Sequence, residues 1–505
     1  MSHLLENRII FFTLSLFLVA LACLGPEGVP FKQYILNLDF TELQVLASEN
    51  DSYFRVPNSP IRIAIFIIAF YVMFQSLRLP IKENVKLSTT LIKVINYLIF
   101  LFLIVNLITN NGSNLIFISL FAISMFYILF RKNIIDDDYS RIEILLLCSM
   151  FLMFFITIFS SIYHESSLTE IDNYSRFLLF IPIYLLLRDI KINFTEFYLI
   201  INIASIITGL VALYYFFILG EIRVSVYSSS AIIYGNISLL LMVFSYLTIK
   251  PYNDSSKSLL LPTLGVFFAF VAWSLTGTRG SLLGVIILLL ILFFNRKYRK
   301  GIFIPDIKVI IASIFFFGIA ISQTTNVHRF TEGFNSGYNY IVYGEETNWK
   351  NPDSIMPRLI IWKGSYNILK DNLIFGVGLD KFNIKLSEQI KDKKIPMIRK
   401  DFKNPTAGLN HAHNQYLDIF AKMGIFGFIL LILFLLININ FFHQKFKSSS
   451  LLKQNIALFG MTTIVMYMSH MMTHAVFSHH HSTIFMLMVL ILFFSSIINL
   501  EKRGN

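Results

Sequence analysis

The stretch NHAHNQYLDIFAKMGIFGFILLILFLLININFF, residues 410–442, joins a short polar start to a long apolar run. The apolar run exceeds the roughly 20 helical residues that the hydrocarbon core of a bilayer requires. His411, His413 and Asn414 stand at its beginning. Polar side chains at the edge of a membrane span are either interfacial residues or candidates for function. The stretch therefore predicts a membrane-spanning helix that carries candidate functional residues at one end.

The composition of the whole chain is that of a protein with many membrane spans. The 505 residues are 55% hydrophobic and 14% charged, they include 52 phenylalanines, and the mean hydropathy is +0.66. A soluble globular protein of this size is much less apolar. Two cysteines, Cys23 and Cys148, exclude a disulfide framework or a thiolate metal cluster and are expected to be buried in apolar runs.

The chain is therefore predicted to be an all-α polytopic membrane protein with about 12–14 transmembrane helices. The candidate spans are residues 9–24, 61–77, 91–108, 115–130, 142–163, 177–188, 197–219, 231–249, 259–275, 281–294, 309–322, 414–442, 456–475 and 483–499. Of these, 177–188 and 281–294 are short enough to be half-spans.

Lysine and arginine are distributed unevenly between the two sides of these spans. With a cytoplasmic amino terminus, the inner segments contain 22 of them, whereas the short outer segments contain six. Basic residues accumulate in cytoplasmic loops, so both termini are predicted to be cytoplasmic. The net charge of +12 is then explained by basic cytoplasmic loops and by surfaces that face anionic lipid or phosphate. It does not require a nucleic-acid ligand.

Residues 323–413 form one large loop that this topology places on the outer side. The loop carries 13 basic and 9 acidic residues, and long loops cross the membrane largely regardless of charge. Periodicity predicts an amphipathic helix over 358–370, and 372–382 contains a Gly-x-Gly turn before a further helix candidate. The chain contains no G-x-x-x-x-G-K-[ST] loop, so the sequence gives no sign of ATP hydrolysis.

On a helical wheel, His413, Leu417, Phe420, Gly424 and Gly427 share one face of the predicted span 414–442. The two glycines are expected to let another helix approach closely. His413 would lie at a helix amino terminus, where unpaired N–H groups and the helix dipole favour an anion. A neutral imidazole there accepts a proton near pH 7. The alternative interpretation is that these histidines are interfacial polar residues.

Three arginines fall on the predicted outer side. Arg279 lies in the helix-breaking stretch TGTRGSLLG, Arg358 begins the amphipathic stretch with Trp362 four residues later, and Arg223 lies in the loop before residue 231. An arginine fork binds phosphate through two hydrogen bonds, whereas lysine offers a point charge. Together they favour an anionic, lipid-linked substrate. Individually each is also compatible with a surface charge or a snorkelling anchor.

The stretch SHMMTHAVFSHHHS, residues 469–482, is a second histidine-rich segment. His470 and His474 are one helical turn apart, a spacing that is compatible with a zinc site. No carboxylate or cysteine accompanies these histidines, which favours interfacial histidines near the substrate path and no metal. Asp418 and Lys422, four residues apart, are expected to neutralise each other inside the bundle.

These residues resemble the O-antigen ligase family of bacterial inner-membrane glycosyltransferases. His413 and Asn414, nine residues, Gly424, two residues and Gly427 match the family pattern H-[NSQ]-x9-G-x2-G in full.

Two further elements resemble the same family. Arg279 with Leu283 matches its R-x3-L element, and Arg358 with Trp362, followed by FGVGLDKF, matches its loop segment before the histidine. Leu373 stands where the family frequently has a proline. The resemblance covers residues 220–440.

The resemblance implies a substrate and a reaction. The donor would be a glycan on undecaprenyl diphosphate, and the acceptor would be a hydroxyl group of the lipid A core. The transfer would take place on the periplasmic side. The reaction would invert the anomeric configuration and use neither a metal nor a cofactor. The protein would lie in the bacterial inner membrane as helices 1–11 (1–322), a large periplasmic loop with amphipathic helices (323–413) and helices 12–14 (414–505).

The predicted roles follow from the matched motifs. Arg279 and Arg358 are expected to hold the diphosphate, and His413 to remove or orient the acceptor proton. The predicted substrate-binding residues are Arg223, His411, Asn414 and Trp362.

Three alternatives stay open. Related polymerases extend the glycan on another lipid carrier, although they usually match the histidine pattern less well. Related protein O-oligosaccharyltransferases often carry a longer carboxy-terminal region than the six residues after the last span here. A lipid-linked glycan transporter would need polar groups near the bilayer midplane, whereas the candidates here gather at the outer surface.

Overall fold

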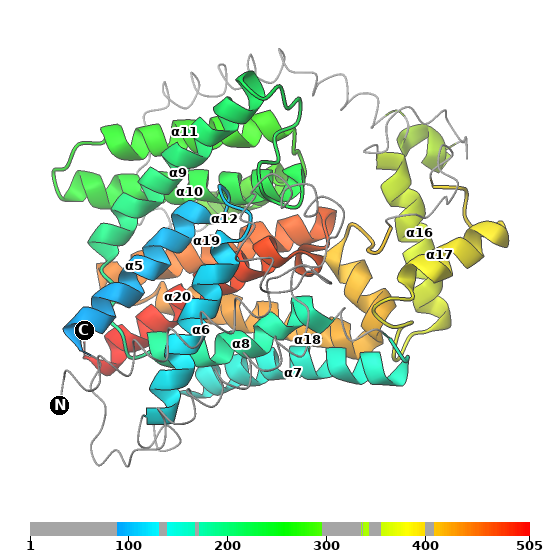
Figure 1. The fold of residues 1–505 in the computed structure, drawn as a ribbon, viewed down its shortest axis with the longest axis horizontal. Coiled ribbons are helices and arrows are strands. Elements are labelled where there is room, and N and C mark those ends of the chain that lie inside the picture. Colours follow the sequence, from blue (N-terminus) through cyan, green and yellow to red (C-terminus); the bar gives the residue numbers. More distant parts are fainter. Residues whose placement is uncertain are drawn as a thin grey trace, which may run out of the picture. The chain divides into compact units, whose positions relative to one another are not determined.

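In a computed structural model, the parts of the chain that the structure describes are residues 88–130, 139–166, 171–294, 335, 337–342, 355–398 and 409–504. Every regular element in these parts is helical. The α-helices are α5 (Thr89–Val105), α6 (Gly112–Phe130), α7 (Arg141–Tyr163), α8 (Asp172–Leu187), α9 (Phe194–Phe217), α10 (Ala231–Asp254), α11 (Leu260–Thr276), α12 (Leu282–Phe294), α16 (Ile355–Asp371), α17 (Phe382–Lys391), α18 (Gln415–Lys445), α19 (Leu451–Thr473) and α20 (His480–Lys502), with one 3-10 helix, η2 (Val476–Ser478) (Figure 1).

Among the described helices, six are long and apolar enough to cross a membrane: α7, α9, α10, α18, α19 and α20. The apolar helices α5, α6, α11 and α12 are shorter in their apolar parts. Each predicted span that falls on described residues coincides with one of these helices or with α8, which contains Pro182. The spans predicted at 9–24, 61–77 and 309–322 lie outside the described residues.

The chain forms two compact units. One comprises 1–88 and 118–137, of which the structure describes Ser88 and residues 118–130 of α6. The other comprises 89–117 and 138–505 and contains all the candidate site residues.

Helix α20 forms the centre of the larger unit. It is buried along almost its whole length and packs against α8, α10, α18 and α19. Figure 1 shows α19 beside α20, and α19 is buried to a similar extent. A helix that is apolar on all sides is usually buried, so α20 is the core helix of this bundle.

Helices α9, α10 and α11 pack closely through small and polar residues. A Cβ on Gly209 would lie 2.4 Å from the carbonyl oxygen of Phe268, so the two backbones nearly touch. Asn202 donates to the Thr248 hydroxyl over 3.0 Å. Small residues and side-chain hydrogen bonds are how membrane helices associate without a hydrophobic driving force.

One end of the bundle brings together the beginning of α18 and the connection between α19 and α20. The backbone N–H of Phe477 in η2 donates to the Gln415 side-chain oxygen over 2.6 Å. A Cβ on Gly280, in the turn from α11 to α12, would lie 2.6 Å from the Thr473 hydroxyl at the end of α19. We refer to this end as the histidine end because His411, His413, His474 and His479 lie there.

The opposite end is held by buried and exposed ion pairs. Arg188, after α8, donates through Nε to Glu143 of α7 over 2.5 Å, and the Tyr184 hydroxyl donates to the same carboxylate over 2.7 Å. Both members of the ion pair are at most 2% exposed. Lys445 of α18 pairs with Glu501 of α20 over 2.7 Å. These contacts hold α7 to the end of α8, and α18 to α20, at this end of the bundle.

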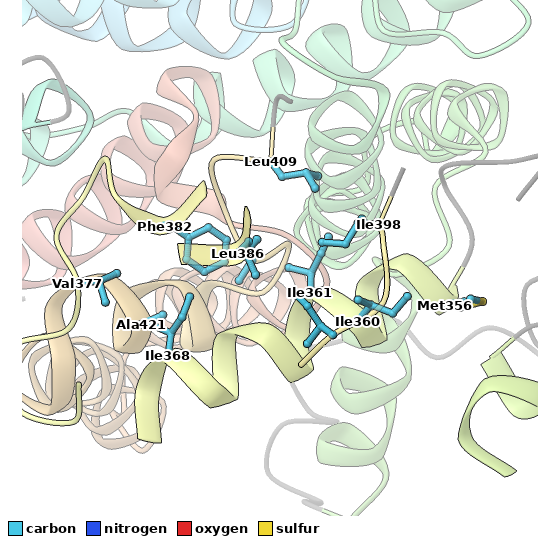
Figure 2. Packing of buried hydrophobic residues seen from close by; sticks show 12 residues of the cluster. Met356, Ile360, Ile361, Ile368, Val377, Phe382, Leu386, Ile398, Leu409 and Ala421 are labelled. Atoms are coloured by element: carbon cyan, nitrogen blue, oxygen red, sulfur yellow. The ribbon is translucent and has the colours of Figure 1, made fainter. Parts of the chain in front are cut away.

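The helices of the predicted large loop pack onto the beginning of α18. A buried apolar cluster joins Ile360 and Ile368 of α16, Phe382 of α17 and Ala421 of α18, as Figure 2 shows. The helix predicted over 358–370 and the helix predicted after the Gly-x-Gly turn are therefore α16 and α17.

The prediction that Cys148 is buried is wrong. Its side chain is exposed on α7, on the same outer surface as Leu145 and Leu152. In a membrane bundle an apolar position faces lipid as readily as protein, so hydropathy alone does not reveal which side it takes. Cys23 lies outside the described residues.

We predict that Glu143→Ala destabilises the bundle by about 3–5 kcal/mol, because it removes the buried carboxylate that accepts from both Arg188 and Tyr184. Thermal unfolding of the purified protein in detergent would measure the change. Glu196→Ala removes an exposed carboxylate from the first turn of α9 and serves as the matched control. Equal melting temperatures for the two variants would contradict the role of the ion pair.

Candidate active site

Helix α18 is interrupted at Gly424, where φ is 65° and ψ is −161°. Essentially only glycine adopts this backbone conformation. The prediction of a continuous helical face through His413, Gly424 and Gly427 is therefore wrong in its geometry. A Cβ on Gly427 would meet Met423 and Ile419 of the same helix, not a neighbouring helix.

The loop between α16 and α17 docks onto this break. Val377 N–H donates to Ala421 O over 2.9 Å, Gly378 N–H donates to Lys422 O over 3.0 Å, and Ile425 N–H donates to Leu373 O over 2.9 Å. The break frees backbone groups that an intact helix would use internally, and the loop satisfies them.

The glycines of this contact are required by space as well as by conformation. A Cβ on Gly424 would lie 2.1 Å from the carbonyl oxygen of Ile374, and one on Gly376 would lie 2.4 Å from the backbone of Lys422. The partner that Gly424 admits is thus the loop with the Gly-x-Gly turn, and not a second transmembrane helix.

Ala412 fixes the turn that carries the two histidines. It is fully buried in the apolar cluster, its N–H donates to Asp418 Oδ1 over 2.9 Å, and its carbonyl accepts from the Trp362 indole over 3.1 Å. Because Ala412 faces the cluster, its two neighbours project elsewhere. Trp362 therefore contacts the turn between His411 and His413, and its predicted binding of substrate stays a prediction.

His413 has a left-handed backbone with φ of 50°, a conformation that costs free energy in a residue with a side chain. Asn414 follows it as the cap of α18, and its Oδ1 accepts from Tyr416 N–H over 3.0 Å and from Leu417 N–H over 3.2 Å. The expected unpaired N–H groups are therefore partly occupied by Asn414. Asn414 shapes the site through this cap.

Four imidazole rings gather at this point. The ring centres of His411 and His413 are 4.3 Å apart, and those of His413 and His474 are 6.1 Å apart. The rings of His474 and His479 stack with their centres 4.6 Å apart, and the ring centres of His411 and His479 are 5.5 Å apart. We call these four residues the histidine cluster. It joins the beginning of α18 to the connection between α19 and α20.

Three of the four imidazoles of the histidine cluster, those of His411, His474 and His479, have lowered pKa values and are neutral near pH 7. Burial, then the neighbouring His413 and His479, and then the charges of Lys422 and Arg358 lower the pKa of His411 well below its usual value. Burial, the other rings and Arg358 do the same to the pKa of His474, and burial with the neighbouring charges lowers the pKa of His479 to about 4. Neutral imidazoles can accept a proton or bind a hydroxyl group.

The arginines reach the histidine end from three different elements. Arg279 lies in the turn between α11 and α12, next to Gly280, which contacts the end of α19. Arg358 projects from α16 close enough for its charge to affect His411 and His474. Their side chains are half-buried. Arg279 and Arg358 therefore share the histidine end with the histidine cluster.

Arg223 supports the turn that carries Arg279. Its Nε donates to the carbonyl oxygen of Thr276 over 3.0 Å, and Val224 N–H donates to Leu275 O over 3.2 Å. A part of its guanidinium is thus used to hold the protein backbone. Its predicted contact with phosphate stays a prediction.

The pair Asp418 and Lys422 forms an ion pair of 3.1 Å, as predicted. Asp418 also accepts from Ala412, so the pair belongs to the scaffold of the histidine turn. Within the described residues, no group of three or more His, Cys, Asp or Glu side chains has the arrangement to hold a metal ion.

Residues 264–432 match the family model described as O-antigen ligase. This stretch is similar to the O-antigen ligase family. It contains Arg279, Arg358, His413 and the broken part of α18, so the family match covers the core of the geometry described above. Arg223, His474 and His479 lie outside the matched stretch.

A protein of Haemophilus influenzae (strain Rd), described as uncharacterized, is 29% identical to this chain over 390 residues. The similarity covers 76% of this chain and 94% of that protein. It therefore extends well beyond the stretch that matches the family model.

Sequence reasoning brought the O-antigen ligase residues to one end of the bundle but did not assign His474 and His479 to the site. The sequence predicts interfacial histidines near the substrate path for their histidine-rich segment, without a role in the site. Its spacing does not reveal that the α19–α20 connection folds back onto His411 and His413, because this contact spans about 60 residues of chain.

We predict that Gly424→Ala displaces the docked loop, because its Cβ collides with the Ile374 carbonyl and its backbone strain costs about 1–3 kcal/mol. The expected result is at least a tenfold loss of glycan transfer with a lowered melting temperature.

Gly220→Ala is the matched control. Gly220 also has positive φ, at 71°, but a Cβ there has no atom within 4 Å. Normal transfer by Gly424→Ala, or an equal loss from both variants, would contradict the docking role of Gly424.

Proposed function

We propose that this protein transfers a glycan from undecaprenyl diphosphate to an acceptor hydroxyl, with the lipid A core as acceptor, at the periplasmic face of the inner membrane. The family match supports a glycosyltransferase of the O-antigen ligase and polymerase type. The single observation that carries the proposal is that His413 and two arginines from separate elements, Arg279 and Arg358, lie at the same end of the bundle.

The donor diphosphate would bind between Arg279 and Arg358. Negative charge on the diphosphate grows as the glycosidic bond to it breaks. Preorganised positive groups in a site of low dielectric stabilise such charge strongly. Both arginines come from fixed elements, since Arg279 lies in a turn held by Arg223 and Arg358 lies on the docked helix α16.

The acceptor hydroxyl would be activated by His413. The hydroxyl oxygen forms a bond to the anomeric carbon, the bond from that carbon to the diphosphate oxygen breaks, and the hydroxyl proton moves to the imidazole. A single displacement of this kind inverts the anomeric configuration. Undecaprenyl diphosphate leaves with both electrons of the broken bond.

The remaining predicted residues support these two roles. His411 accepts a hydrogen bond from the His413 backbone N–H over 3.3 Å through Nδ1, which leaves its other ring nitrogen as the donor. Asn414 and Trp362 hold the turn through the contacts described above. His411, Asn414 and Trp362 would thus lie on the acceptor side of the reaction.

A periplasmic location agrees with the distribution of charges. The predicted outer residues Arg223, Arg279 and His413 share the histidine end, whereas Lys445, Arg188 and Lys502 lie at the opposite end. Basic residues accumulate on the cytoplasmic side. A site at the helix ends also favours transfer over transport, because a transporter binds its substrate near the bilayer midplane.

We predict that His413→Ala reduces transfer about 10²- to 10⁴-fold, the usual contribution of a general base. Arg279→Ala is expected to reduce it about 10²- to 10³-fold through the lost stabilisation of the leaving group. The measurement is transfer of glycan from the lipid-linked donor in purified membranes. Addition of EDTA is expected to leave the rate unchanged.

His443→Ala, in the last turn of α18, is the control for loss of an imidazole far from the site. Normal transfer by folded His413→Ala or Arg279→Ala protein would contradict the proposed mechanism.

Deletion of the gene identifies the acceptor class. We predict that the deletion strain loses glycan-capped lipopolysaccharide and accumulates the bare lipid A core. Loss of long chains only would assign the protein as a polymerase, and loss of a glycoprotein would assign it as a protein transferase. Accumulation of the lipid-linked glycan on the cytoplasmic side would indicate a transporter.

A further inference from the structure

The connection between α19 and α20 is built to hold His474 and His479 beside His413. Phe477 N–H donates to Gln415, and Asn173 at the start of α8 donates to the carbonyl oxygen of Ser478 over 3.3 Å. Phe477 also packs its ring edge against Phe177, with the ring centres 5.0 Å apart. A loop tied to α8 and α18 in this way presents its histidines in fixed positions.

His474 is buried without hydrogen bonds from either ring nitrogen. It is 2% exposed, and no described protein group lies within hydrogen-bond distance of Nδ1 or Nε2. His479 differs, since its Nδ1 lies 3.1 Å from the Ser229 hydroxyl. Buried polar atoms are nearly always hydrogen-bonded in native structures, and leaving them unpaired costs free energy. His470, one turn earlier, also has no partner for either ring nitrogen, but of the two residues it is His474 that lies against His411 and His413. The unpaired nitrogens of His474 are therefore the ones placed to meet a partner that binds beside His413.

The chemistry of that partner follows from the surroundings. Burial and the nearby Arg358 keep the His474 ring neutral, so it offers one N–H donor and one acceptor nitrogen. A phosphate has strong acceptors only and is better matched by the two arginines. A sugar hydroxyl both donates and accepts, so it can satisfy a neutral imidazole. His474 also lies against His411 and His413, on the proposed acceptor side.

We propose that His474 is a further binding residue of this site and hydrogen-bonds a hydroxyl group of the acceptor glycan. This inference rests on the proposed function and deepens it. The arginines bind the charged donor, and the imidazoles of the α19–α20 connection bind the uncharged acceptor. His474 lies outside residues 264–432, so its role adds a part of the chain that the family match does not include.

The test compares His474→Ala with His474→Gln in nanodiscs. The acceptor is the glycan-free glycoconjugate purified from the deletion strain, and the probe for donor binding is undecaprenyl diphosphate. His474→Ala is expected to raise KM for the acceptor about three- to tenfold, the range of one lost hydrogen bond. It is expected to leave kcat and binding of undecaprenyl diphosphate nearly unchanged. His474→Gln restores a donor and an acceptor and is expected to recover most of the loss.

His470→Ala is the matched control, because His470 is an equally buried imidazole one turn earlier on α19 that contacts Tyr467 and none of the histidine cluster. An unchanged acceptor KM in His474→Ala would overturn the inference while leaving the proposed function intact. The inference would also be overturned if His470→Ala raised the acceptor KM as much as His474→Ala does. A loss of kcat and of donor binding in His474→Ala that His474→Gln does not restore would overturn it as well.

If the unaltered protein transfers nothing to this acceptor, the proposed function fails. The inference is then decided by the acceptor's binding alone, measured as a thermal shift. Weaker binding by His474→Ala, restored by glutamine, supports the hydroxyl site, and unchanged binding overturns it.

Discussion

The backbone pairing between the interrupted helix α18 and the loop before α17 is the contact on which the site depends. Gly424 opens the helix, and the carbonyls of Ala421 and Lys422 then accept from Val377 and Gly378. A second attachment, from Trp362 to Ala412, joins α16 to the histidine turn. One attachment is on α16 and the other is in the loop that follows it. Together they fix the orientation of α16, so Arg358 is held in place relative to His413. The spacing between His413 and Gly424 thus sets the distance from the histidine turn to the docking point.

Much of the fold could be predicted from hydropathy and periodicity. The described apolar helices coincide with predicted spans, and the helix periods of the large loop predict α16 and α17. The charge rule and the motifs also brought Arg279 and His413 to the same end of the bundle. These features leave a signal in side-chain type and spacing, which is why sequence reasoning finds them.

The errors at the site arise from backbone geometry, whereas the error at Cys148 arises because hydropathy does not tell lipid from protein. A helical wheel assumes an unbroken helix, but Gly424 adopts a conformation outside the helical region, so the face drawn through Gly424 and Gly427 does not exist. Backbone hydrogen bonds carry no side-chain pattern, and the partner of Gly424 was therefore assigned to another helix instead of a loop. The contact of His474 with His413 joins two separate helix ends, and only the folded chain reveals it.

The site combines two electrostatic environments within one helix end. Cationic arginines suit a diphosphate, while burial keeps the neighbouring imidazoles uncharged and suited to hydroxyl groups. The most direct test is an experimental structure of the protein in nanodiscs with undecaprenyl diphosphate bound. The expected result is a diphosphate that contacts Arg279 and Arg358, with His413 facing it across the site. A diphosphate bound at the opposite end, beside Arg188 and Lys445, would contradict the central claim.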